Sequence, residues 1–190
     1  PPPPPGSRAE YDQILSVRHL SVLDAYNFCS AVIENAGESF SCWDAVLRGG
    51  GRLWGLAADD THNFYPFDSP GNDAFGGYVM VKSDSLALDD IMEAFARGSF
   101  YSSCGGPAIE DFFVSDGDIH LRCSPAKRIY FSSQARHYRW LIAERDGELM
   151  TEFICPLRGG ELYVRAECFD ERGKKSFTNP IWLAEPDGGV

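Results

Sequence analysis

The first half of the chain carries apolar stretches of strand length, separated by turns and by helix-like segments. Three stretches rich in apolar and β-branched residues, at 20–27, 52–60 and 76–84, predict buried strands. The glycines at 49–51 stand just before the second of these stretches, where they are suited to end a helix. Alternation of strands with helices predicts parallel strands joined by crossover helices.

Two segments of this half have the features of helices. Residues 41–51 offer Ser41 as a capping residue at the start and the glycines at the end. Acidic residues near the start of the segment at 86–100 and Arg97 near its end suit the helix dipole. In this second segment, apolar residues with the spacing of one helical face are Leu88, Ile91, Met92 and Phe95.

The pattern changes after about Cys104, where short strand-like stretches follow one another without helical periodicity. Turn signals such as Asp116-Gly117 and Gly159-Gly160 separate them, which predicts an antiparallel β-sandwich. Asp146-Gly147 stands between two of these stretches and predicts a hairpin. The stretches are residues 108–114, 118–124, 128–133, 138–145, 148–156, 161–169 and 179–185.

These changes divide the chain into three parts. Residues 1–10 open with a proline run and are predicted to be a disordered tail. Residues 11–103 carry the alternating strands and helices, and residues 104–190 form the sandwich-like extension. The predicted fold class is therefore α/β plus β.

Composition and charge narrow the functional classes. The net charge of -11 argues against nucleic-acid binding, and it would repel a phosphorylated substrate unless bound cations reverse the local sign. No apolar run is long enough to span a membrane, and no signal peptide is visible. The six cysteines form no C-x-x-C pair, which argues against a zinc ribbon. Their wide spacing and apolar surroundings indicate buried reduced thiols and predict a cytoplasmic location, with secretion and three disulfides as the alternative.

Candidate chemistry stands at the end of the stretch at 52–60, where Asp60 and His62 follow apolar residues. In α/β folds, ligands collect at the carboxyl ends of parallel strands, and side chains at i and i+2 of an extended segment point the same way. A carboxylate and an imidazole can together hold a divalent transition metal, namely zinc, manganese or iron. The alternative is a polar turn, in which the aspartate caps the loop and the histidine is a structural group.

An ordered series of motifs resembles the later part of the PHP (polymerase and histidinol phosphatase) superfamily. The resemblance covers about residues 20–183, and its C-terminal end resembles the β-rich extension found on some members. The matching pieces are Trp43-Asp44, Gly51-Arg52, Asp60 with His62, Gly76-Gly77-Tyr78, the segment 98–103 and Thr178-Asn179-Pro180-Ile181.

This resemblance implies a distorted (β/α)7 barrel that holds two or three metals at its strand ends and hydrolyses phosphoesters. Asp60 and His62 match the last metal-binding motif, so residues 11–103 are expected to form the C-terminal portion of such a barrel. The chain departs from the family pattern because it contains no H-x-H motif. Two ligands are too few for a catalytic zinc site, so we expect the chain to be inactive alone.

An incomplete barrel exposes a strand edge, which favours pairing with a second copy or with a companion N-terminal segment. Arg52 and Lys82 are candidates to hold the phosphate of a small phosphorylated substrate, with solvated surface charge as the alternative. A nucleophilic thiol at Cys104 lacks an assigned histidine partner. The first functional hypothesis is a PHP-type metal-dependent phosphoester hydrolase. The second is a non-catalytic binding or interaction module built on the β-rich extension.

Overall fold

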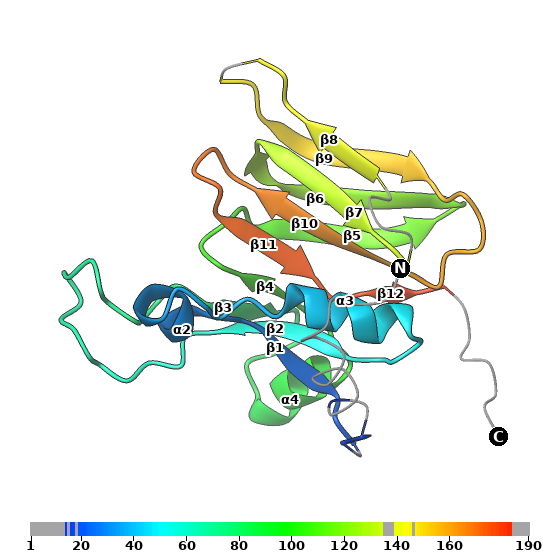
Figure 1. Ribbon diagram of the computed structural model, residues 1–190. Helices are drawn as coiled ribbons and strands as arrows, with labels where there is room; N and C mark the ends of the chain where they lie inside the picture. Colours follow the sequence, from blue (N-terminus) through cyan, green and yellow to red (C-terminus); the bar gives the residue numbers. More distant parts are fainter. Residues whose placement is uncertain (1–13, 15, 18, 135–138, 146, 184–190) are drawn as a thin grey trace.

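The computed structural model describes residues 14, 16–17, 19–134, 139–145 and 147–183 and is mostly β, with 40% strand and 16% helix. Two antiparallel sheets face each other, and a small parallel pair of strands lies beside them with the helices (Figure 1). The described residues contain no closed barrel, so the predicted α/β class with a partial (β/α) barrel is wrong. The tail predicted at 1–10 lies outside these residues. No described helix combines the length and apolar character needed to cross a membrane.

The parallel part of the structure is a single pair of strands. β1 (Val22–Asn27) and β2 (Trp54–Ala58) pair in parallel. The connection between them contains α2 (Phe28–Ile33) and α3 (Phe40–Arg48), as expected for a crossover. On the other edge of β1, the backbone of residues 37–39 hydrogen-bonds to Ala25 and Asn27, so this edge is partly covered.

The next strands break the alternation, which is the physical reason that the barrel prediction fails. β3 (Tyr78–Val81) and β4 (Phe100–Ser103) flank α4 (Leu88–Ala96), yet they pair antiparallel. The helix buries only part of its apolar stripe: Phe95 stacks on Phe100 of β4 with ring centroids 4.7 Å apart, whereas Leu88 and Met92 are 72% and 55% exposed. β4 also pairs with β11 (Lys175–Thr178), so β3 and β4 belong to the sheet of the C-terminal part.

The antiparallel sheets expected in the C-terminal part are present. The larger has the order β3-β4-β11-β10-β7-β8 with β12 beside β10, and the smaller has the order β5-β6-β9. The hairpin expected at Asp146-Gly147 includes residue 146, which is outside the described residues, and the flanking strands β8 and β9 belong to different sheets. The remaining strands are β5 (Ile109–Ser115), β6 (Asp118–Ala126), β7 (Arg128–Ser132), β8 (Arg139–Ile142), β9 (Met150–Pro156), β10 (Tyr163–Phe169) and β12 (Ile181–Trp182).

A shared core joins the parallel pair to the sandwich. Trp43 of α3 is fully buried and lies with its ring centroid 5.8 Å from that of Phe177 on β11. Tyr163 of β10 and Ala25 of β1 belong to the same buried cluster. The parts predicted on either side of residue 103 are therefore packed into one body.

A buried arginine adds a polar link between α3 and β10. The Arg165 side chain is 1% exposed, and its guanidinium donates to Asp44 Oδ1 and to Glu167 Oε1, each at 2.7 Å. Its guanidinium carbon lies 4.9 Å from the centroid of the Trp43 ring. Burial opposes the charge of Arg165, but the two carboxylates outweigh this effect and raise its pKa. Arg165 therefore stays charged and needs both partners.

We expect Arg165→Met to lower the free energy of unfolding by about 3–5 kcal/mol, because two carboxylates lose their buried cation. Arg122→Met is the matched control, since its ion pairs with Glu110 and Asp111 are exposed, and it should cost less than about 1 kcal/mol. Urea denaturation followed by circular dichroism measures both values. Equal losses in the two variants would contradict the role given to Arg165.

Candidate metal site

The loop that follows β2 is closed at its base by one carboxylate. Asp59 accepts hydrogen bonds from three consecutive backbone N–H groups, those of residues 75–77, at 2.6, 2.8 and 2.7 Å. A Cβ atom at Gly77 would lie 2.6 Å from the carbonyl oxygen of Ala58, so this close approach requires glycine. Asp59 therefore has a structural role, because it joins the two ends of the loop at 60–74.

Three potential metal ligands meet at this loop. The thiol of Cys29, the imidazole of His62 and the carboxylate of Asp73 offer donor atoms that all lie within 4.8 Å of one another. Cys29 Sγ is 3.6 Å from His62 Nδ1 and 3.8 Å from Asp73 Oδ2. Cys29 comes just after β1 and His62 after β2, and parallel pairing brings the two strand ends to one edge. Sulfur, nitrogen and oxygen donors of these types fit zinc.

The two buried members of this group differ in protonation. The backbone N–H of His62 donates to Asp73 Oδ2 at 2.7 Å, and this bond, with those of neighbouring amides, lowers the pKa of Asp73 although the group is buried. Burial raises the pKa of the Cys29 thiol, and the carboxylates of Asp73 and Asp60 raise it further. A divalent cation would reverse this effect, because it favours the thiolate and releases the thiol proton.

Asp60 and His62, which the sequence paired as ligands, have different partners in the structure. Asp60 Oδ2 accepts a hydrogen bond from Asn27 Nδ2 at 3.1 Å and is not one of the three clustered donors. Asn27 Nδ2 also donates to Asp24 at 3.2 Å. The i, i+2 expectation assumed extended backbone, but Asp60 has a left-handed φ of 53°. The side chains of Asp60 and His62 therefore lie at the same strand end but make contacts with different partners.

Arg52 lies at the other end of β2 from the three donors. Its guanidinium carbon is 5.2 Å from the centroid of the Trp182 ring. A strand rises roughly 3.3 Å per residue, so the length of β2, roughly 13 Å, separates Arg52 from the strand end that carries His62. The structure therefore does not bring the predicted phosphate ligand to the same place as the metal ligands.

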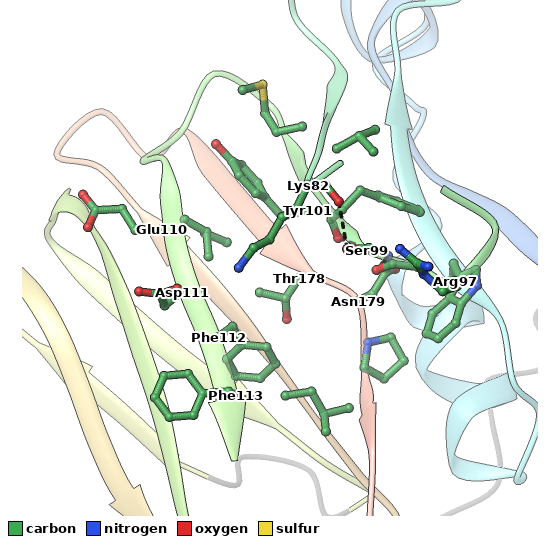
Figure 2. A pocket seen from close by; sticks show the side chains of 18 residues that line it. Lys82, Arg97, Ser99, Tyr101, Glu110, Asp111, Phe112, Phe113, Thr178 and Asn179 are labelled. Atoms are coloured by element: carbon green, nitrogen blue, oxygen red, sulfur yellow. Dashed lines mark hydrogen bonds between the residues drawn. The ribbon is translucent and has the colours of Figure 1, made fainter. Parts of the chain in front are cut away.

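Lys82, the other predicted phosphate ligand, lines a separate groove of about 770 Å³ (Figure 2). Lys82 follows β3 and Arg97 stands at the end of α4, whereas Glu110 and Asp111 belong to β5 on the other side of the groove. Arg97 is already paired with Glu93 at 2.8 Å. None of the three clustered donors lines this groove, so it is distinct from the candidate metal site.

The loop beside the donors exposes several aromatic rings. Phe64 stacks on His62 with ring centroids 5.2 Å apart, and Phe67 and Phe75 lie 5.7 Å apart. Phe64, Phe67 and Phe75 are 61%, 69% and 79% exposed. Exposed rings gathered beside a polar cluster are suited to contact the apolar part of a ligand.

Sequence reasoning missed Cys29 and Asp73. The position of Cys29 just after β1 was a usable signal, because β1 is the parallel neighbour of the strand that leads to His62. Asp73 carries no comparable signal, since only the closure of the loop by Asp59 returns it to His62.

We expect Asp59→Ala to lower the free energy of unfolding by on the order of 3 kcal/mol, because three amides lose a charged acceptor. The amides of residues 75–77 should also exchange hydrogen faster. Asp84→Ala, at an exposed position before α4, is the control and should change stability by less than about 0.5 kcal/mol. Denaturation and hydrogen-exchange measurements test this, and unchanged exchange at 75–77 would refute the closure.

Cys104, considered above as a nucleophile, is 4% exposed, and burial raises the pKa of its thiol to about 12. The thiol stays protonated below that pH, so we expect no alkylation of Cys104 by iodoacetamide at pH 8 in the folded protein. Peptide mass spectrometry reads the result, with the guanidinium-unfolded protein as the positive control. Rapid labelling of Cys104 in the folded state would restore it as a nucleophile.

Comparisons of this chain with protein-family models, with curated proteins and with solved structures give no match. The resemblance to the PHP superfamily therefore stays a prediction from sequence motifs. The chemistry of the clustered donors is the basis on which a function can be assigned.

Proposed function

We propose that this chain is a metal-dependent phosphoester hydrolase whose metal is held by Cys29, His62 and Asp73. The observation that carries the proposal is the gathering of three donors within 4.8 Å at the end of a parallel strand pair. Catalytic zinc takes three protein ligands and keeps one position open. Cys29 and Asp73 are buried whereas His62 is exposed, which gives the group a side that solvent and substrate can reach.

The number of metal ligands that meet in this chain supports hydrolytic activity. Asp60 and His62 alone fall short of a catalytic zinc site, whereas Cys29 and Asp73 bring the clustered set to three. Asp60 lies close enough for its charge to act on Cys29. We propose that Asp60 strengthens cation binding through its charge, as a secondary contributor beside the three ligands.

A bound zinc, manganese or iron ion would polarise a phosphoryl oxygen and acidify water. The Cys29 sulfur favours zinc or iron over manganese. The positive charge of the ion would locally offset the net charge of -11, which favours a small phosphorylated substrate over nucleic acid. Phe64 and Phe75 on the loop are placed to contact the organic part of such a substrate.

Location and assembly are also proposed. All six cysteines are free and buried, which suits the reducing cytoplasm. The part of the β1 edge that residues 37–39 leave uncovered is where a companion segment or a second copy would add a strand.

We expect the chain to bind about one zinc ion, and His62→Ala to weaken binding by at least about tenfold, because three ligands become two. Asp60→Asn should weaken binding less than His62→Ala does. The matched control is His120→Ala, which should bind zinc normally. The His120 ring lies in the sandwich and stacks on Phe113, with ring centroids 4.7 Å apart. Isothermal titration of chelator-stripped protein and elemental analysis measure these values.

The loaded chain should hydrolyse p-nitrophenyl phosphate, and a chelator or Cys29→Ala should lower kcat/KM by at least about tenfold. Zinc binding of full strength in His62→Ala would show that the ligand set is wrong. Metal binding without hydrolysis would reject the enzyme while keeping the metal site. Absence of both would favour the non-catalytic binding module.

A further inference from the structure

One face of the larger sheet carries charged and aromatic side chains that have no part in the metal site. Along β7, Ile129 and Phe131 are buried in the sandwich core. Arg128 and Tyr130 alternate with them and therefore point to the outer face. The register pairs Tyr130 with Trp140 of β8, which continues this face across the neighbouring strand.

This face and helix α3 line a groove of about 740 Å³, a size typical of small-molecule sites. The two carboxylates of the lining, Asp44 and Glu167, are both engaged by the buried Arg165. The arginines of the lining outnumber its carboxylates, so the groove carries net positive charge although the net charge of the chain is -11. We call it the arginine groove after the four arginines that line it, Arg48, Arg128, Arg139 and Arg165.

Two of these arginines are available to a ligand. Within the part of the chain that the structure describes, neither Arg48 nor Arg128 forms a salt bridge with a carboxylate. The guanidinium carbon of Arg128 lies 4.7 Å from the centroid of the Phe169 ring. Stacking on a ring holds a guanidinium in place and leaves its N–H edge free to bind a carboxylate or phosphate in two-point fashion.

Aromatic surface lies next to these cations. Trp140 is 57% exposed and is the cross-strand neighbour of Tyr130. Tyr130 in turn packs edge to face on Phe169, with ring centroids 5.6 Å apart. An exposed tryptophan beside an ordered arginine offers a flat ring a stacking surface and its anionic group a donor.

We propose that the arginine groove binds a small aromatic anion, whose ring stacks on Trp140 and Tyr130 while its carboxylate or phosphate accepts hydrogen bonds from Arg128 and Arg48. No residue of the groove belongs to the metal-ligand group, so this binding is independent of phosphoester hydrolysis.

Four probes distinguish the contribution of an aromatic ring to binding from that of a negative charge, and binding of a carboxylate from binding of a phosphate-like group. Phenylphosphonate, which has no ester bond to cleave, and benzoate carry both features, whereas benzamide lacks the charge and inorganic phosphate lacks the ring. Titration calorimetry of the full chain in EDTA keeps the metal site out of the measurement. We expect phenylphosphonate or benzoate to saturate one site and the other two probes to bind at least about tenfold more weakly. The tighter of the first two identifies the anionic group.

Variants test the residues. Arg128→Gln and Trp140→Ala should each weaken the tighter probe by at least about tenfold while zinc binding stays normal. If Arg128→Gln lowers the melting temperature of the protein, Arg48→Gln on helix α3 is the variant to use in its place. Arg122→Gln, an arginine of the other sheet that is 59% exposed, is the control and should bind normally. No saturable binding of either aromatic anion, or equal binding by wild type and the groove variants, would overturn the proposal.

Discussion

The carboxylate of Asp59 is the constraint on which the candidate site depends. Its three hydrogen bonds to the backbone of residues 75–77 close a long, exposed loop at the end of β2. Closure returns Asp73 to the start of the loop, where it accepts the N–H of His62 at 2.7 Å. The parallel neighbour β1 delivers Cys29 to the same edge. Donors from three separate places in the sequence thus meet because one carboxylate fixes the path of the loop.

A parallel pair of strands is too small to be stable alone, so its rigidity comes from the sandwich. Asn179 provides a direct link, because its Oδ1 accepts the N–H of Gly55 on β2 at 3.0 Å. Its Nδ2 donates to the carbonyls of Gly98 and Phe100 at 3.1 and 3.2 Å. The sandwich therefore holds the strands that carry the site, and its own outer face remains free for a second ligand.

Short-range patterns predicted β1, β2, β3, the helices α3 and α4 and most antiparallel strands of the C-terminal part, because periodicity and turn residues are local properties, but they missed α2 and β11. They could not predict that β4 pairs with β11, since nothing near residues 100–103 indicates a partner more than seventy residues away. A helix between β3 and β4 suggested a parallel crossover, but long-range pairing decided the topology. At the site, the spacing of Asp60 and His62 predicted metal ligands at this strand end, and only His62 belongs to the clustered donors. The left-handed φ of Asp60 and the return of Asp73 to His62 depend on the path of the loop, which the spacing does not indicate.

A zinc ion held by Cys29, His62 and Asp73 can be located directly by anomalous diffraction from a crystal of the zinc-loaded chain, recorded on both sides of the zinc absorption edge. We predict one strong peak in bonding contact with the Cys29 sulfur, the His62 imidazole and the Asp73 carboxylate, at about 2.0–2.3 Å from each. A peak bound by other residues, or no peak beside these three, would contradict the site described for this protein.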